Sequence, residues 1–139
     1  MASYLDQQNI YVPLDGQKTS GVTTAATATL TADDGGKVVI GTLGSGTQTF
    51  TLPTVVGNTG LRFTLICGHA SGEILINPQT GEKIFGKTHG AENGTGIANT
   101  TTGIKNTAAT NVVGDLCELV SDGVDTWWMK AVAGVWATQ

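Results

Sequence analysis

The sequence predicts an all-β protein: a single antiparallel β-sandwich or jelly-roll-like domain preceded by an extended N-terminal arm. Glycine and threonine supply 20 and 23 of the 139 residues. Threonine suits strands better than helices, and glycine favours turns. Short β-prone runs also recur between clusters of Gly, Asn, Asp and Pro, which is the spacing typical of a sandwich. The length is that of one domain with its own hydrophobic core.

The domain boundaries follow from the same pattern. Residues 1–20 are polar and irregular, with one short Ile-Tyr-Val cluster, and form the predicted arm. Residues 21–139 form the predicted β-sandwich domain, which contains a long loop at residues 86–110. This loop is poor in apolar residues and has only Ile97 and Ile104 as anchors, so we expect it to be mobile or ordered by a partner.

The first half of the domain contains four predicted strands, at residues 22–30, 37–42, 47–52 and 61–68. Between the first two, Thr31 can cap a helix, two aspartates follow it, and a glycine pair ends the segment. These residues predict a single helical turn. The glycine-rich segment before the third strand is followed by neither a lysine nor a helix, so it predicts a turn rather than a phosphate loop.

Alternation gives the third and fourth strands their faces. In the third, three threonines point one way while Gln48, Phe50 and Leu52 point the other, and Pro53 ends the strand. In the fourth, one face carries Leu61, Phe63, Leu65 and Cys67, and the other carries Arg62, Thr64 and Ile66. Both patterns predict one buried face and a threonine-rich face toward solvent.

The second half contains predicted strands at residues 73–77, 82–85, 111–120 and 124–132. A Ser-Asp-Gly-Val sequence from Ser121 predicts a hairpin between the last two strands. In the last strand Trp127 shares its face with Met129 and Ala131 and is expected in the core. Trp128 lies on the opposite, polar face with Thr126 and Lys130.

The residues predict neither an enzyme nor a metal or cofactor site. Cys67 and His69 lie two apart on a strand, which separates them by roughly 6.6 Å, too far for the hydrogen bond that would activate a thiol. His89 lies in the glycine-rich loop and is expected to be solvated. The close aspartate pairs occupy turns and lack the spacing of a calcium loop. Cys67 and Cys117 are expected as small buried core residues, and a disulfide between them stays open.

Charge and hydropathy exclude further classes. Seven Lys and Arg against eleven Asp and Glu give a net charge of −4, which excludes a strongly basic nucleic-acid-binding protein. The N-terminus has no basic and apolar signal pattern, and no stretch approaches the apolar length of a membrane-spanning helix. We therefore expect a soluble protein, made in a cytoplasm, that binds neither nucleic acid nor membrane.

An outward tryptophan on a polar face points to a partner, because exposed tryptophans are common interface anchors. The sequence therefore predicts a partner surface at Trp128, with Trp136 adding to the same patch. The polar arm, residues 1–20, would suit clamping a neighbour by strand addition, in which backbone hydrogen bonds give affinity. The predicted partner-binding residues are Tyr4, Leu5, Ile10, Tyr11, Val12, Trp128 and Trp136.

The order of motifs resembles a small β module of tailed-phage virion proteins. The matching segments are Leu-Thr-Ala-Asp-Asp-Gly-Gly-Lys from Leu30, Thr-Leu-Pro ending at Pro53, Gly-Leu-Arg-Phe from Gly60, Ile-Leu-Ile-Asn from Ile74, and Ser-Asp-Gly-Val-Asp-Thr-Trp ending at Trp127. Together they span about residues 22–132. The long loop at residues 86–110 departs from the pattern.

The resemblance implies a non-enzymatic virion protein. Members are head decoration (cement) proteins and tail-fibre segments. A short chain that begins with Met1 and ends soon after the module is expected to be a decoration protein. The resemblance then implies a homotrimer that lies in the host cytoplasm during assembly and afterwards on the capsid exterior, where it bridges major capsid protein subunits.

Two other functions stay open at this point. A fibre or spike module would recognise a host-surface glycan or protein. A glycoside hydrolase would need two carboxylates facing each other across a cleft. The residues that could supply them are Asp33, Glu73, Glu82, Glu92 and Glu118.

Overall fold

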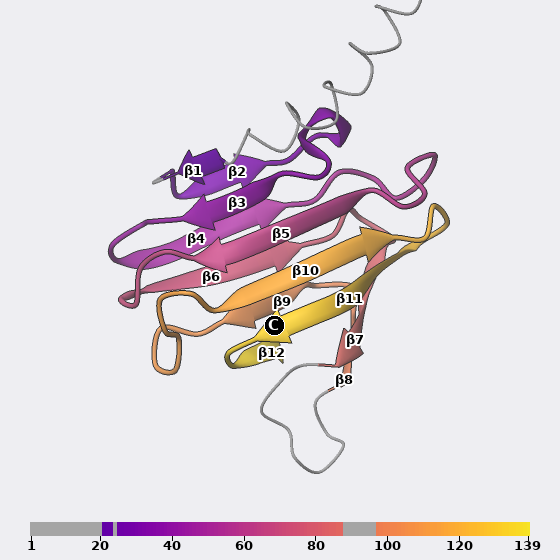
Figure 1. Cartoon of the computed structure of the whole chain (residues 1–139). Coiled ribbons are helices and arrows are strands. Elements are labelled where there is room, and N and C mark those ends of the chain that lie inside the picture. The colour runs from indigo at the N-terminus through magenta and orange to yellow at the C-terminus, as the bar shows by residue number, and fades with distance from the viewer. Residues whose placement is uncertain (1–20, 24, 88–96) are drawn as a thin grey trace, which may run out of the picture.

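The computed structural model describes residues 21–23, 25–87 and 97–139, and it confirms the predicted β-sandwich (Figure 1). A seven-stranded sheet packs against a five-stranded sheet. The predicted arm, residues 1–20, lies outside the described residues. Among the described residues, no helix has the length and apolarity that a membrane crossing requires.

The larger sheet has the strand order β1-β3-β5-β10-β11-β7-β8. Its strands are β1 (Gly21–Thr23), β3 (Val38–Gly41), β5 (Arg62–Cys67), β10 (Leu116–Ser121), β11 (Thr126–Ala133), β7 (Lys83–Lys87) and β8 (Ile97–Thr100). The smaller sheet has the order β12-β9-β6-β4-β2. Its strands are β12 (Trp136–Thr138), β9 (Ile104–Asn106), β6 (Gly72–Asn77), β4 (Gly46–Thr51) and β2 (Thr27–Thr29).

The first six strands wind between the two sheets, because β1, β3 and β5 belong to the larger sheet and β2, β4 and β6 to the smaller. Strands of one sheet from successive turns of this winding pair in parallel. The sheets are therefore mixed, and the prediction of an antiparallel sandwich is wrong in this respect. Alternation along a strand reports which face is buried, but it does not report whether the next strand turns back or crosses to the other sheet.

The segment predicted as one strand, residues 22–30, is β1 and β2 on different sheets. Gln48 on β4 holds the corner between them. Its side chain is 1% exposed, and its Nε2 donates to Thr23 O at 2.9 Å and to Ala25 O at 2.8 Å. The buried amide thus joins the end of β1 to the start of the next segment, and it adds to the hydrogen bond that Thr23 O already accepts from Thr42 N at 2.9 Å. The predicted helical turn is present as the 3-10 helix η1 (Ala32–Asp34).

Two boundaries in the second half differ from the prediction. The predicted loop at residues 86–110 contains β8 and β9, so it is not a single open loop; residues 88–96 lie outside the described chain. The predicted strand at residues 111–120 begins only at Leu116. Asn111 and Asp115 are buried, with 8% of each exposed, and they hold the preceding segment as a loop.

The core lies between the sheets and takes the predicted inward residues, including Phe50, Phe63 and Trp127, all 0% exposed. The rings of Phe63 and Trp127 are 5.7 Å apart. A register shift at Glu118/Leu119 inserts one extra residue into β11. Because of this bulge Ala131 is exposed, whereas we predicted it to face the core beside Trp127.

The turn between β11 and β12 gives a test of the packing. Gly134 has φ +85°, and a Cβ there would come within 2.1 Å of the Asp115 carboxylate. Gly81 also has φ +85° but has open space around it. We predict that Gly81→Ala lowers the free energy of unfolding by about 1 kcal/mol, the cost of the left-handed backbone, and Gly134→Ala by about 3 kcal/mol because overpacking adds to it. Urea unfolding measures both, and equal losses would contradict the packing of Gly134 on Asp115.

Candidate partner-binding surface

Trp128 lies on the outer face of the larger sheet, as predicted, with 44% of the residue exposed. Two contacts fix its indole. Its Nε1 donates to Asp122 Oδ2 at 3.3 Å, and the ring of Phe85 on β7 meets it edge-on at 4.9 Å between centroids. An aromatic side chain held in one orientation loses little conformational freedom on binding, which favours its use as an anchor.

Asp122 organises the hairpin that supports Trp128. Its Oδ1 accepts hydrogen bonds from the backbone N–H groups of Val124, Asp125 and Thr126, at 2.8, 3.1 and 3.0 Å. Burial raises the pKa of Asp122, but these N–H donors and the Trp128 indole outweigh burial, so the pKa lies below its ordinary value of 3.8. The charged carboxylate therefore fixes both the turn and the indole.

The outer face of the larger sheet is more apolar than the sequence alternation predicted. Ile40, Ile66 and Leu116 are direct neighbours across β3, β5 and β10. All three are half-buried, and none is among the residues packed against the core. In Figure 1 no described segment crosses this part of the sheet. These three side chains form an apolar row across the outer face of the larger sheet.

A second row lies across the same face nearer the hairpin. Val120 on β10 pairs with Trp128 on β11, and Trp128 pairs with Phe85 on β7. Glu118 and Lys130 lie between the two rows and form an ion pair at 3.0 Å. We call the two rows and this ion pair the Trp128 surface. Two apolar rows with an ion pair between them form a mixed surface of the kind that another protein can cover.

The outer face of the smaller sheet has a different character. Thr47, Thr49 and Thr51 line β4, and Thr27 and Thr29 line the neighbouring edge strand β2. Leu75 on β6 is the large apolar side chain that interrupts this face. The predicted threonine-rich face is therefore present, but on one sheet, and the apolar outer face belongs to the other.

The other predicted partner-binding residues behave differently. The expectation that Trp136 adds to the Trp128 patch is wrong, because Trp136 is 2% exposed and belongs to the core. It lies on β12, which pairs with β9, and its Nε1 donates to Ala133 O at 3.1 Å. The arm residues Tyr4, Leu5, Ile10, Tyr11 and Val12 lie outside the described residues.

The sequence placed Ile66 on the outward face with Arg62 and Thr64, as the structure has it, but it missed Ile40, Leu116 and Val120 as surface residues. For the other three, apolar residues stand on both faces of the strand, which is also the pattern of a strand buried on both sides. Only the sheet order shows that one of these faces is open.

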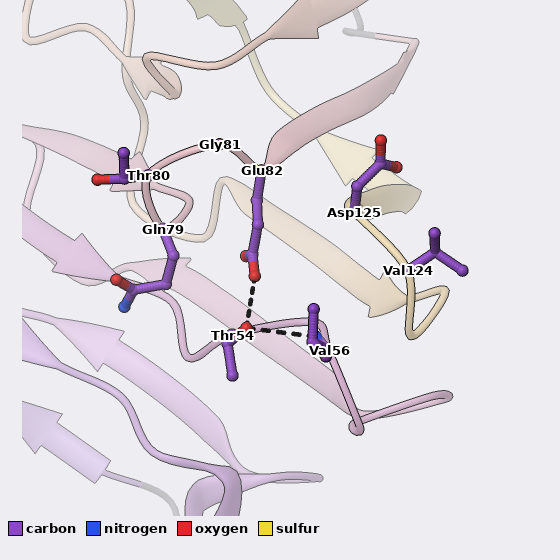
Figure 2. A pocket seen from close by; sticks show the side chains of 8 residues that line it. All are labelled: Thr54, Val56, Gln79, Thr80, Gly81, Glu82, Val124 and Asp125. Atoms are coloured by element: carbon purple, nitrogen blue, oxygen red, sulfur yellow. Dashed lines mark hydrogen bonds between the residues drawn. The ribbon is translucent and has the colours of Figure 1, made fainter.

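A shallow pocket lies beside the hairpin (Figure 2). Its lining residues are Thr54, Val56, Gln79, Thr80, Gly81, Glu82, Val124 and Asp125. Glu82 is 6% exposed, and its Oε1 accepts from Thr54 Oγ1 at 2.6 Å and from Val55 N at 2.8 Å. Asp125 is 3.4 Å from Lys83 Nζ. Both carboxylates thus hold neighbouring segments in place, and the pocket is open rather than a cleft with opposed acids.

The remaining candidates for chemistry are occupied by structural contacts. Cys67 Sγ donates to His69 O at 3.2 Å, and His69 Nδ1 accepts from Ser71 N at 3.1 Å, so thiol and imidazole do not meet. Burial raises the pKa of both the Cys67 and Cys117 thiols, and both are free rather than paired. Within the described chain, no three His, Cys, Asp or Glu side chains gather as metal ligands.

Comparison with known proteins adds no relative: no protein-family model matches the chain, and no curated protein matches it.

The Asp122 hairpin predicts a pH response at Trp128. Because the folded pKa of Asp122 is lowered, its stabilising contacts are present above pH 3.8 and are lost as the pH falls through the lower value. We expect the Trp128 indole N–H resonance to stay constant down to 3.8 and to shift below it. In Asp122→Asn the resonance should be displaced at every pH and lack this step. Asp125→Ala is the control and should keep the step; a wild-type step above 3.8 would contradict the assignment.

Proposed function

We propose that this protein is a phage head decoration protein that binds the outer surface of the capsid and bridges major capsid protein subunits as a homo-oligomer. The observation that carries the proposal is the Trp128 surface, in which two apolar rows flank an ion pair and a tryptophan is held in one orientation. The motif order described above supports the phage assignment by resemblance.

The proposed mechanism is mechanical. Burying the two apolar rows of the Trp128 surface against a capsid subunit would remove apolar area from water, the dominant favourable term in protein association. The Trp128 indole is already fixed by Asp122 and Phe85, so docking orders few side chains. A protein that contacts two subunits adds contact area across their junction and opposes their separation when packaged DNA strains the shell.

Charge is consistent with close packing beside other proteins. Only 13% of the residues are charged, and the threonine face of the smaller sheet carries few of them. Many copies can then occupy neighbouring positions on one particle with little mutual repulsion. The same property would suit a fibre or spike module, which is why the binding test includes host cells.

We predict that Trp128→Ala weakens binding to phage heads at least about 30-fold, because truncating an interface tryptophan typically costs 2 kcal/mol or more. The measurement is co-sedimentation with heads of the source phage that lack this protein. Leu75→Ala on the opposite sheet is the control and should bind as the wild type.

Two outcomes would overturn the proposal. Wild-type protein that binds host cells but not heads would favour a fibre or spike module. Equal head binding by wild type and Trp128→Ala would remove the Trp128 surface from the interface.

A further inference from the structure

The open pocket beside the Asp122 hairpin contains a carboxylate whose hydrogen bonding is incomplete (Figure 2). Glu82 is the only buried member of the lining, with 6% of the residue exposed. Its Oε1 accepts from Thr54 Oγ1 and Val55 N, but its Oε2 has no hydrogen-bond partner among the described residues. A buried polar group without a partner costs free energy, and such groups are rare in folded proteins. The free oxygen therefore favours a donor supplied by another molecule.

The charge of the pocket favours a cation as that donor. Within the part of the chain that the structure describes, Glu82 forms no ion pair. The second carboxylate of the lining, Asp125, lies 3.4 Å from Lys83 Nζ, and 51% of its side chain is exposed. Two carboxylates beside one lysine leave the pocket negative. A buried charge without a counterion is costly, so a positive group that enters the pocket gains both attraction and a hydrogen bond.

The free oxygen favours an ammonium group over a guanidinium group or a metal ion. A guanidinium binds best across both oxygens of one carboxylate, but Oε1 of Glu82 already accepts two donors. Magnesium and calcium usually take about six oxygen ligands or more. An ammonium group is a compact point charge that can use a single oxygen. This oxygen is covered in the free protein, and a small rotation about the soft terminal torsion of glutamate would turn it toward the pocket.

The rim of the pocket suits an alkyl chain. Val56 and Val124 are 64% and 71% exposed, and neither belongs to the core or packs against it. Figure 2 shows Glu82 reaching toward Thr54, with Val124 and Asp125 on the other side of the pocket. A lysine side chain buries its aliphatic stem along apolar surface and keeps its charge at the tip. Its stem can therefore contact the valines while its ammonium group binds Glu82.

We propose that this pocket binds a primary ammonium group on an alkyl stem, the side chain of a lysine presented by another protein. The inference goes beyond the proposed function, because it assigns a second site and depends neither on Trp128 nor on a capsid. Val124 and Asp125 belong to the hairpin whose Asp122 holds the Trp128 indole. A partner that covers this hairpin can therefore contact both sites.

The test is the binding of Nα-acetyl-lysine methylamide to the wild-type chain, followed by amide NMR at constant ionic strength. The backbone N–H of Val55 is the reporter, because it donates to Glu82 Oε1. We expect a saturable shift of this resonance. The uncharged norleucine analogue should bind at least about tenfold more weakly, since a hydrogen bond to a charged group contributes a factor of that order.

Three variants locate the site. Glu82→Gln keeps the shape of the side chain and an oxygen for Thr54 and Val55, and it should weaken the lysine analogue at least about tenfold. Glu73→Gln is the matched control, because it removes the same charge from β6 on the other sheet, and it should bind as the wild type. Val124→Ser removes apolar contact with the stem and should weaken binding about fourfold. Its urea unfolding should be unchanged, because Val124 makes no core contact.

A Val55 shift that stays linear with probe concentration, as expected if Oε2 only holds a buried water, overturns the inference. So does equal binding of the norleucine analogue, tighter binding of an arginine analogue, unchanged affinity in Glu82→Gln, or equal weakening in Glu73→Gln. These measurements use no phage heads. Loss of head binding therefore affects only the proposed function, and loss of lysine-analogue binding affects only this site.

Discussion

The winding of the chain between two sheets is the constraint on which the rest of the structure depends. The first six strands alternate between the two sheets, so each connection among them passes from one sheet to the other and each strand turns one face toward the core. Gln48 fixes the first of these connections, because its buried amide donates hydrogen bonds to the carbonyls of Thr23 and Ala25 between β1 and β2. Once both inner faces are committed to the core, the two outer faces are free to differ in chemistry.

The outer face of the smaller sheet is rich in threonine, whereas that of the larger sheet carries apolar rows. On β4 the outward positions are threonines, whereas on β3 and β5 the outward Ile40 and Ile66 stand side by side. The cross-strand isoleucine pair stabilises the sheet, and its exposed part also leaves apolar area that another protein can cover. The division therefore bears on function more directly than the overall composition does.

The alternation of apolar and polar residues predicted most strands. It failed for features that depend on which distant strands pair. The alternation in Arg62–Cys67 and Gly46–Thr51 is a property of each strand, and both strands are present as predicted. The parallel pairing is not encoded in either strand alone. The prediction that Trp136 is exposed failed for the same reason. Its burial depends on the pairing of β12 with β9, and these strands are thirty residues apart in the sequence. Ala131 was misplaced because one bulge residue shifts every later position to the other face.

Two aspartates hold the two ends of the β10–β11 pair in different ways. At one end Asp122 uses its charge, accepting three backbone N–H groups and the Trp128 indole while remaining at the surface. At the other end Asp115 is buried, and its Oδ2 accepts hydrogen bonds from Asn106 Nδ2 and Val112 N. The hairpin end therefore depends on a carboxylate at the surface, whereas the opposite end depends on a carboxylate that is buried beside an amide.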